Sequence, residues 1–398
     1  MATPKLRFKE FDGDWSESKL KDCIDSIDSG WSPQCESYPA DENEWAVLKT
    51  TSVDWDGFKA NFNKKLPSNL EARFEIEVKP NDILVTRAGP TERVGVVAVV
   101  PHNVRSKLMI SDKLIRLKAN NENNPEFLGI SLSSVKCQNQ LQSKTSGLAK
   151  SQTNISQKIL CDVSLMTPAK AEQTKIASFL SNVDEKISQL TQKHELLSQY
   201  KQGMMQKLFS KQIRFKADDG SEFGEWENIS VKEIFDVTRG QVLAVSNTVS
   251  VADADYKYPV FSSQTKQKGL MGFYKKYLFE DALTWTTDGA NAGDVNFRKG
   301  KFYCTNVCGV LLSKKGYANL CIAEILNKVT HKYVSYVGNP KLMNNVMSEI
   351  PITIPINLEE QTKIANFLSA IDQKIEVVAE QIEQAKIWKK GLLQQMFV

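Results

Sequence analysis

The sequence predicts an α+β protein built as a tandem duplication, in which each of two globular domains is followed by one long helix. Three observations predict this fold: a 40-residue segment occurs twice, both copies have a helical apolar pattern, and short strand-like runs fill the regions between them. The predicted domains cover residues 1–167 and 211–357, and the predicted helices cover residues 168–210 and 358–398.

The repeated segment is the strongest signal in the chain. Residues 171–210 align without a gap to residues 359–398 at a constant offset of 188, and 17 of the 40 aligned positions are identical. Neither copy contains proline, and the only glycines, Gly203 and Gly391, lie near the ends. Both copies are therefore expected to be continuous helices.

Apolar residues recur in both copies at steps of three and four, with a period of about 3.5 residues, the pattern of a coiled coil. His194, Lys201 and Lys389 interrupt this seam. We expect the two helices to pair antiparallel within one chain about a pseudo-twofold axis. The alternatives are that each helix packs on its own globular half or on a second copy of the chain. The seam positions are Ile176, Leu180, Val183, Ile187, Leu190 and Leu197 in the first copy and Ile364, Leu368, Ile371, Ile375, Val378 and Ile382 in the second.

The globular halves carry short runs of β-branched and aromatic residues separated by turn residues, which indicates an α+β domain in each half. A helix is expected over residues 319–330 in the second half. The strand-like runs are residues 45–50, 74–78, 83–86, 94–100 and 114–117 in the first half, and residues 258–261, 282–286, 295–297, 307–312 and 350–354 in the second.

Composition leaves few classes of chemistry open. The 51 basic and 47 acidic residues give a net charge of +4, which allows a nucleic-acid partner without demanding one. The seven cysteines include no CxxC pair, so we expect reduced thiols in a cytoplasmic protein and no metal site, Cys304 and Cys308 included. We also expect no membrane segment and no signal peptide.

Motifs for catalysis are also missing from the sequence. No glycine-rich loop for S-adenosylmethionine or a dinucleotide, no nucleotide-binding P-loop and no nucleophile–histidine pair stands out, so we expect no catalytic residue. The remaining catalytic alternative is a metal-dependent nuclease using Glu75, Glu77 and Lys79, but a solvated strand of alternating charge is the favoured explanation of these residues.

Polar and basic side chains in the second half suggest contacts with DNA. Lysine and arginine suit phosphates, asparagine and glutamine can pair with adenine, and aspartate can accept from cytosine. The alternative is an ordinary polar loop between strands. The candidates are Ser263, Gln264, Thr265, Lys266, Thr286, Thr287, Asp288, Asn291 and Arg298.

The first half has a matching turn after a strand, with Thr86, Arg87 and Arg93 as candidates for DNA contact. Arginine bound to guanine is the commonest specific base contact. A second stretch, residues 142–153, is polar, basic and free of acids, and it contains Lys144 and Lys150. It could follow a phosphate backbone or be a flexible surface loop.

Across its full length the chain resembles the specificity subunits of Type I restriction–modification systems. The resemblance rests on the EQTKIA helix repeat, on the Pro-containing run 350–355 before the second copy, and on the domain openings at Leu6-Arg7-Phe8 and Ile213-Arg214-Phe215. Residues 258–265 and 286–293 look like one type of target recognition domain in that family. The entry into the first helix, residues 165–170, departs mildly from the pattern because it has one proline, which leaves the start of that helix in doubt.

The resemblance implies that two target recognition domains, joined by the paired helices, read the two halves of a split, asymmetric site in double-stranded DNA. It implies two modification subunits that methylate adenine N6, and restriction subunits, as protein partners. S-adenosylmethionine, ATP and Mg²⁺ would then belong to the partners, with no cofactor in this chain. A coiled-coil scaffold that binds proteins only is the competing interpretation.

Overall fold

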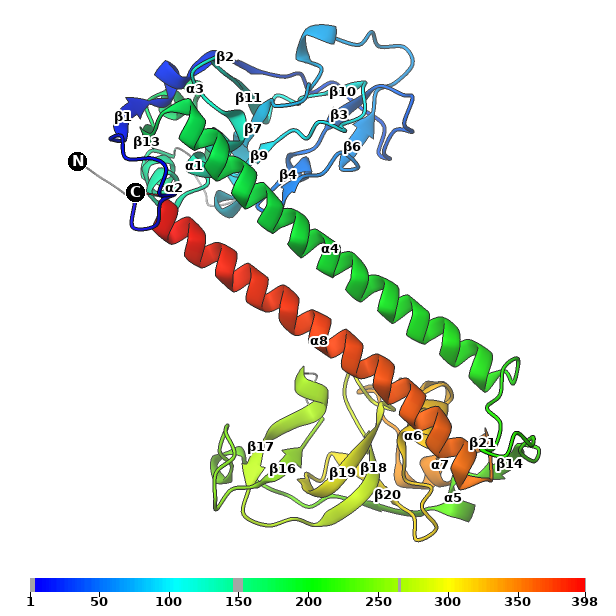
Figure 1. Cartoon of the computed structure of the whole chain (residues 1–398). Coiled ribbons are helices and arrows are strands. Elements are labelled where there is room, and N and C mark those ends of the chain that lie inside the picture. Colours follow the sequence, from blue (N-terminus) through cyan, green and yellow to red (C-terminus); the bar gives the residue numbers. More distant parts are fainter. Residues whose placement is uncertain (1–3, 146–152, 264–265, 398) are drawn as a thin grey trace. The chain divides into compact units, whose positions relative to one another are not determined.

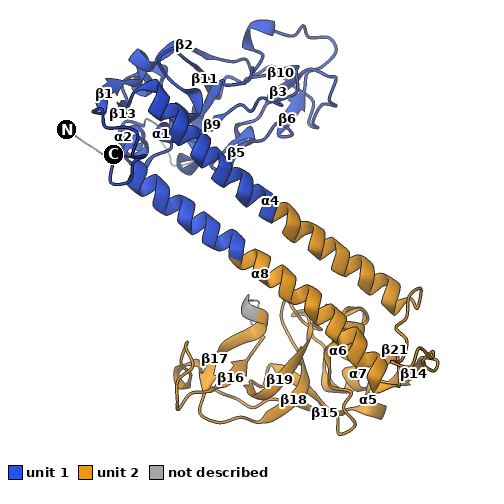
Figure 2. Ribbon diagram, viewed as in Figure 1, with its two compact units in different colours: residues 1–190, 381–398 blue, residues 191–380 orange. Residues whose placement is uncertain are grey.

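A computed structural model describes residues 4–145, 153–263 and 266–397. The chain divides into two compact units, one made of residues 1–190 and 381–398 and the other of residues 191–380 (Figure 2). Each unit thus contains one globular α+β part together with one end of each long helix. The two units are described separately below.

Unit 1 is built on two sheets (Figure 1). An antiparallel sheet has the order β2-β11-β7-β9, and a smaller sheet has the order β10-β3-β6, in which β10 and β3 are parallel. The strands of the first are β2 (Ile24–Ser29), β11 (Leu114–Ala119), β7 (Ile83–Thr86) and β9 (Val97–Val99), and those of the second are β10 (Leu108–Met109), β3 (Ala46–Leu48) and β6 (Asn63–Lys65).

The central strand β7 is buried on both faces, which explains its continuous apolar sequence. Ile83 and Val85 pack into the same core as the first turns of the long helix, whereas Leu84 packs into a second core with the smaller sheet. The first of these cores is completed by the helices α1 (Pro125–Leu132), α2 (Val135–Gln142) and α3 (Gln157–Cys161). Short strand pairs join β1 (Ser16–Lys19) to β13 (Ser164–Thr167), β4 (Val53–Asp54) to β5 (Gly57–Phe58), and β8 (Ala88–Gly89) to β12 (Thr153–Asn154).

Unit 2 has a six-stranded sheet with the order β15-β20-β18-β19-β16-β17. The helices α5 (Val231–Ile234), α6 (Leu320–Asn327) and α7 (Asn344–Glu349) accompany it, and β14 (Glu227–Ser230) pairs with β21 (Pro351–Ile354). The strands of the sheet are β15 (Asp236–Arg239), β20 (Cys308–Leu312), β18 (Phe279–Thr286), β19 (Val295–Cys304), β16 (Tyr258–Phe261) and β17 (Leu270–Tyr274).

The two globular parts share one topology. The order β2-β11-β7-β9 in unit 1 matches β15-β20-β18-β19 in unit 2, and all neighbours in both sets are antiparallel. The parallel pair of β10 with β3 corresponds to the parallel pair of the end of β19 with β16. Asn124 and Asn319 cap α1 and α6 in the same way, each accepting a hydrogen bond from the backbone three residues on. The duplication therefore extends through the globular parts, where the sequences have diverged most.

The two long helices, α4 (Lys170–Phe209) and α8 (Leu358–Met396), run antiparallel and pair within each unit. In unit 1, Phe179 of α4 meets Trp388 near the end of α8, with ring centroids 6.1 Å apart. In unit 2, Lys201 near the end of α4 binds Asp372 near the start of α8 at 2.8 Å. Both helices also pack on the globular part of each unit. The helices therefore pair with each other, as expected, and also pack on the globular parts, which was one of the alternatives.

The expected seam lies on the inner face of the helices. Ile176, Leu180 and Val183 are buried in the core of unit 1, and Ile364 and Leu368 in that of unit 2. Two of the three polar interruptions are ion-paired at positions related by the offset of 188, since Lys389 binds Asp184 at 2.5 Å and Lys201 binds Asp372. The other expected seam positions are buried or half-buried: Leu190, Ile371 and Val378 are buried, and Ile187, Leu197, Ile375 and Ile382 are half-buried.

A buried carboxylate ties the start of each long helix to the globular part in front of it. Glu172 accepts hydrogen bonds from Arg7 Nε and Nη2, both at 2.7 Å, and from the Trp15 indole at 3.3 Å. The same contacts recur in unit 2, where Glu360 accepts from Arg214 Nε at 3.0 Å, Arg214 Nη2 at 2.9 Å and the Trp226 indole at 3.2 Å. These contacts explain why the repeat keeps its glutamate and why an arginine and a tryptophan precede each helix.

The strand predicted at residues 74–78 is not found in the structure. Residues 74–78 were expected to be a strand, but Phe74–Ile76 form a 3-10 helix, and only Glu77 makes an isolated bridge, with Met109. Glu77 is held by Lys79 and by the backbone N–H of Lys107.

Among the residues that the structure describes, no cluster of three histidine, cysteine, aspartate or glutamate side chains could hold a metal ion. Nor do these residues include a helix long and apolar enough to cross a membrane.

Candidate nucleic-acid interface

The loop that follows β7 in unit 1 is closed at its base by Thr86. The Thr86 backbone carbonyl accepts a hydrogen bond from the N–H of Gly95 at 2.9 Å, and Gly95 has a φ of +83°, which favours glycine. The Thr86 hydroxyl donates to the carbonyl of Arg93 at 2.5 Å and accepts from the N–H of Val96 at 2.9 Å. Thr86 is fully buried, so it shapes this loop from inside instead of facing a ligand.

Arg93 also supports the loop, although its side chain remains 27% exposed. Its guanidinium donates to Asp54 Oδ1 at 3.0 Å and to the carbonyls of Val53 at 2.8 Å and Thr50 at 3.3 Å. The pKa of Asp54 is lowered to about 2, chiefly because Lys59 donates a hydrogen bond to it. The Trp55 backbone and Arg93 lower this pKa as well, while partial burial acts in the opposite direction. Arg93 therefore clamps the loop to the β4–β5 hairpin, and its expected contact with DNA stays a prediction.

Arg87, like Arg93, is half-exposed. Its backbone is fixed on both sides, because its N–H donates to Lys113 O at 2.8 Å and its carbonyl accepts from Ile155 N at 3.0 Å. The strand β12 pairs with β8 beside it. Lys144 is exposed just after α2, and Lys150 lies outside the described residues.

The corresponding loop of unit 2 follows β18 and is closed in the same way. Gly293 donates to Thr286 O at 2.9 Å and has a φ of +94°. Thr287 is buried, and its hydroxyl donates to Val307 O at 2.9 Å. Asp288 and Asn291 are half-exposed and remain the side chains of this loop that can meet a ligand, while Thr286 is buried.

A second loop of unit 2 connects β16 to β17. It is closed by a hydrogen bond from Ser262 N to Gly269 O at 2.8 Å, and Lys268 and Gly269 both have positive φ. Ser263 is half-exposed. Gln264 and Thr265 lie outside the described residues, as does the side chain of Lys266, whose backbone is in a 3-10 helix.

Arg298, also expected to bind DNA, is buried beneath this second loop. Its Nε donates to Thr284 Oγ1 at 3.0 Å and its Nη2 to Lys268 O at 2.7 Å, and the guanidinium carbon lies 3.7 Å from the centroid of the Phe261 ring. Burial lowers the pKa of Arg298 to about 10, so the side chain stays charged at neutral pH. Arg298 therefore holds the loop in place from inside the sheet.

The candidates thus sort by position into side chains that face solvent and side chains that support a loop. Arg87, Arg93, Lys144, Ser263, Asp288 and Asn291 face solvent at least in part. Sequence reasoning missed the burial of Arg298 and the contacts that hold Arg93, because composition does not show which way a side chain points. It also missed the chain segment that pairs with each loop, which is β12 in unit 1 and residues 340–342 in unit 2. The signal that marks the two loops as equivalent is the match of Thr86 and Gly95 with Thr286 and Gly293.

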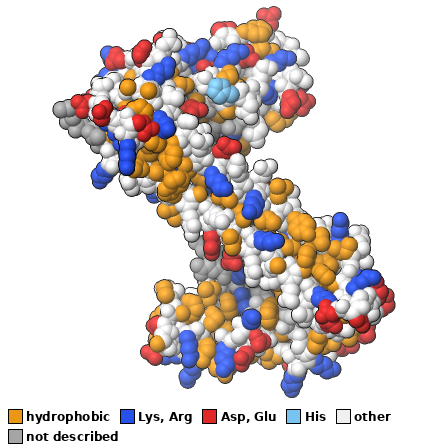
Figure 3. Space-filling model, in the orientation of Figure 1, with side chains coloured by type: hydrophobic (Ala, Val, Ile, Leu, Met, Phe, Trp, Pro, Cys, Tyr) orange, Lys and Arg blue, Asp and Glu red, His pale blue; other side chains and the backbone are white. Residues whose placement is uncertain are grey.

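Charged side chains of both signs lie on the face of unit 2 that is in view in Figure 3. Figure 3 shows Lys and Arg side chains interspersed with acidic and hydrophobic ones over the face of unit 2 in view. Three lysines of unit 2 lie over tyrosine rings: Lys257 over Tyr258, Lys275 over Tyr256 and Lys301 over Tyr277. Such a surface suits a few local phosphate contacts more than strong attraction at long range.

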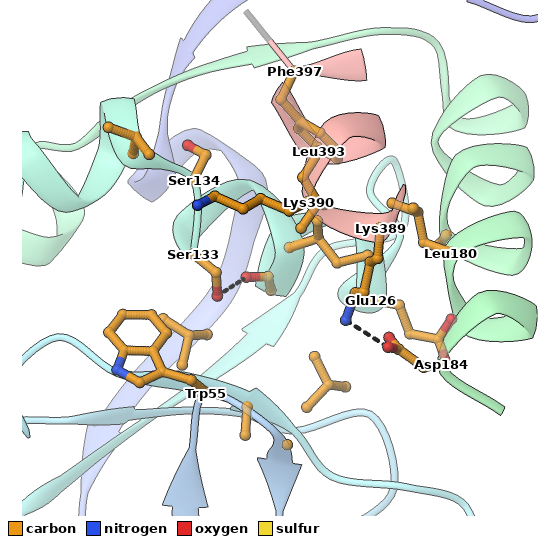
Figure 4. A pocket seen from close by; sticks show the side chains of 18 of the residues that line it. Trp55, Glu126, Ser133, Ser134, Leu180, Asp184, Lys389, Lys390, Leu393 and Phe397 are labelled. Carbon is orange, nitrogen blue, oxygen red and sulfur yellow. Dashed lines mark hydrogen bonds and ion pairs between the residues drawn. The ribbon is translucent and has the colours of Figure 1, made fainter. Parts of the chain in front are cut away.

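Unit 1 also contains a cavity of about 1010 Å³ beside the end of α8. Trp55, Leu180, Leu393 and Phe397 give it an apolar lining, and the ion pair of Lys389 with Asp184 lies on its wall (Figure 4). The Ser133 hydroxyl on another wall donates a hydrogen bond to the carbonyl of Gly129 at 2.9 Å. The lining brings together no activated nucleophile and base, so this arrangement offers packing surface more than chemistry.

Two of the thiols of unit 2 are buried in its sheet. Burial raises the pKa of Cys308 to about 11, and it raises the pKa of Cys304 further still. Both thiols therefore favour the protonated form and are poor nucleophiles at neutral pH.

Comparisons with known proteins agree with this architecture. The family model for the Type I restriction modification DNA specificity domain matches residues 13–199 and 224–386, one match in each half. The EcoEI specificity subunit of Escherichia coli is 38% identical over 178 residues, which are 44% of this chain and 30% of that protein's length, so the match spans about a third of this relative. A putative MjaX specificity subunit of Methanocaldococcus jannaschii is 24% identical over 98% of this chain and 94% of its own length.

Solved structures show the same fold. The S subunit of a Type I restriction–modification system from M. genitalium superposes with a TM-score of 0.69 at 18% identity, covering 100% of this chain and 99% of its own. The family model covers most of the sequence, and its two matches fall on the two halves of the duplication. The chain therefore belongs to the family of Type I restriction–modification DNA specificity subunits.

Proposed function

We propose that this chain reads a DNA target in two parts, one with each unit, and performs no chemistry on it. The observation that carries the proposal is the pair of equivalent loops after β7 and β18, closed by Thr86 with Gly95 and by Thr286 with Gly293. Their closing hydrogen bonds are the same, but their half-exposed candidate side chains differ: Arg87 and Arg93 in one loop, and Asp288 with Asn291 in the other. Equivalent frames with different exposed polar groups suit two readers of different half-sites.

The chemical work would then belong to partner subunits. We propose two modification subunits that methylate adenine N6 and restriction subunits that cleave, with S-adenosylmethionine, ATP and Mg²⁺ bound by the partners. A protein with this task acts on the host chromosome, in the cytoplasm. The relatives described above are named as specificity subunits, which is consistent with this division of work.

The helix pair would fix the unread spacer between the half-sites. The proposal rests on continuity, because α4 begins in unit 1 and ends in unit 2, and α8 does the reverse, without a break in either helix. The ion pairs of Asp184 with Lys389 and of Asp372 with Lys201 would hold the helices in register. A rod of constant length sets half-site spacing by geometry, as dimeric readers do.

An exchange of loops tests the proposal. Residues 262–306 would be replaced by the matching segment of a relative with another target, and the complex with its methyltransferase would be tested for binding to DNA. We expect the half of the motif assigned to unit 2 to change while the other half and the spacer stay the same. DNA binding that ignores the exchange would favour the competing role, a scaffold that binds proteins only.

A further inference from the structure

A short hairpin in unit 2 exposes two apolar side chains at its tip. Ser335 and Lys341 exchange backbone hydrogen bonds of 2.8 and 2.9 Å, and Gly338 turns the chain between them with a φ of +76°. At the tip, Tyr336 is 67% exposed and Val337 is 93% exposed, the highest value among the large apolar side chains described. We call residues 335–341 the 335–341 hairpin.

The base of this hairpin is fixed in the core. Val334 before it and Leu342 after it are both buried with the sheet of unit 2. The indole N–H of Trp285 donates to Leu342 O at 3.0 Å, which ties the hairpin to β18. The fixed base thus presents the apolar tip to solvent, where a binding partner can cover it.

The hairpin lies directly beside the loop that follows β18. Gly289 N donates to Pro340 O at 3.0 Å, and Leu342 N donates to Thr287 O at 2.8 Å. Asp288 and Lys341 form an isolated bridge between the two segments. The hairpin tip therefore shares a rim with Asp288 and Asn291, the solvent-facing candidates for base contacts.

Unit 1 has a segment in the equivalent place, which makes this element part of the duplicated plan. There β12 pairs with β8 in the loop after β7, just as Lys341 pairs with Asp288 in the loop after β18. In each half the paired segment precedes a short helix, α3 or α7, and then the strand that leads to the long helix.

The charges around the tip favour nucleic acid as the partner. Lys332 and Lys341 are exposed on either side of the hairpin, and the exposed His331 is 3.3 Å from Asp294. Lysines suit the phosphates that border a groove, and the thymine methyl is the apolar group that base edges present in the major groove.

We propose that the 335–341 hairpin enters the major groove of the half-site read by unit 2 and that Val337 packs against a thymine methyl group there. Tyr336 lies beside Val337 and contacts the neighbouring base edge. This inference rests on the proposed function, since it adds a contact to the same DNA-reading rim. No polar side chain of the hairpin tip is required for it, so it differs from the hydrogen-bond readers already named.

The test uses the complex of the full chain with its methyltransferase, after the motif has been mapped by its adenine methylation. Binding to a duplex carrying that motif is compared with binding to duplexes in which each thymine of the unit 2 half-site is replaced in turn by deoxyuridine, which lacks the methyl group. We expect one replacement to weaken wild-type binding roughly fourfold, the effect of one buried methyl.

The variants assign that loss to the hairpin. Val337→Ala should weaken binding to the thymine duplex about fifteenfold, as expected for two lost methyl groups, and should be insensitive to the critical deoxyuridine. Val251→Ala removes a valine of unit 2 that is 74% exposed, and this matched control should bind as the wild type does. Because both side chains are exposed, neither variant should alter folding.

Three outcomes separate this inference from the proposed function. If the wild-type complex yields no split motif, the proposed function fails before the hairpin is tested. If a motif is found but Val337→Ala binds like Val251→Ala, the hairpin does not touch the bases. Equal losses for Val337→Ala on the thymine and deoxyuridine duplexes would contradict the methyl contact.

Discussion

Replacing Glu172 by alanine should destabilise unit 1 strongly, because this carboxylate joins the first turn of α4 to the start of the chain. It is 2% exposed and accepts three hydrogen bonds, two of them from Arg7, whose side chain is 15% exposed. Removing one partner of a buried ion pair costs about 3–5 kcal/mol. Since water can partly reach Arg7, we expect a loss near the lower end, about 3 kcal/mol.

Hydrogen exchange of the whole chain measures this loss where it occurs. Residues 4–15 and the first turns of α4 should exchange faster in Glu172→Ala, while unit 2 keeps its protection. Glu360→Ala is the matched variant, and it should expose the corresponding segments of unit 2 and spare unit 1. The double variant Arg7→Met with Glu172→Met should recover much of the loss, because no charge is left buried alone. A change below about 0.5 kcal/mol in Glu172→Ala would refute the tie.

Three further predictions concern the seam, the loop of unit 1 and its support. Leu180→Ala should lower the free energy of unfolding by about 2–5 kcal/mol because Leu180 is fully buried. Ile187→Lys should lower it less, because a half-buried lysine can extend to water. Calorimetry of both variants checks this order, and equal melting temperatures would contradict it. Arg87→Ala should relax base preference by about 1–3 kcal/mol in one half-site only, as seen by binding to duplexes with single changes, and equal relaxation in both half-sites would oppose separate readers. Asp54→Asn should loosen Arg93 and speed proteolysis within residues 86–95. The stability that Asp54 contributes is complete above its ordinary pKa of 3.8 and is lost as the pH falls through about 2, so an acid titration in which the wild type and Asp54→Asn lose stability alike between pH 4 and 2 would contradict this role.

The long helices could be predicted closely because their pattern is local. The expected helices over residues 168–210 and 358–398 correspond to Lys170–Phe209 and Leu358–Met396. The strands β7 and β16 coincide with the predicted runs 83–86 and 258–261, since each is a short buried run bounded by turn residues. The doubtful start of the first helix lies at Lys170, two residues after Pro168.

The candidate site was harder to predict because it depends on contacts between distant segments. Arg93 looks like a DNA-binding arginine in sequence, yet it donates hydrogen bonds to Asp54 and to two carbonyls in or next to β4. Arg298 sits in a basic run, but its partners are Thr284, Phe261 and the carbonyl of Lys268. The strand expected at residues 74–78 is replaced by a 3-10 helix over Phe74–Ile76, where Arg116 binds the carbonyls of Glu75 and Glu77 from a strand distant in sequence.

The most direct test of the central claim is a map of N6-methyladenine in the chromosome of a host that expresses this chain with its methyltransferase. The account predicts methylation in a motif of two short defined halves separated by a spacer of fixed length and free sequence. It also predicts that exchanging residues 262–306 rewrites one half and leaves the other half and the spacer unchanged. A single continuous motif, or no methylation by a complex shown to be assembled, would contradict the claim that two units of this chain read DNA separately.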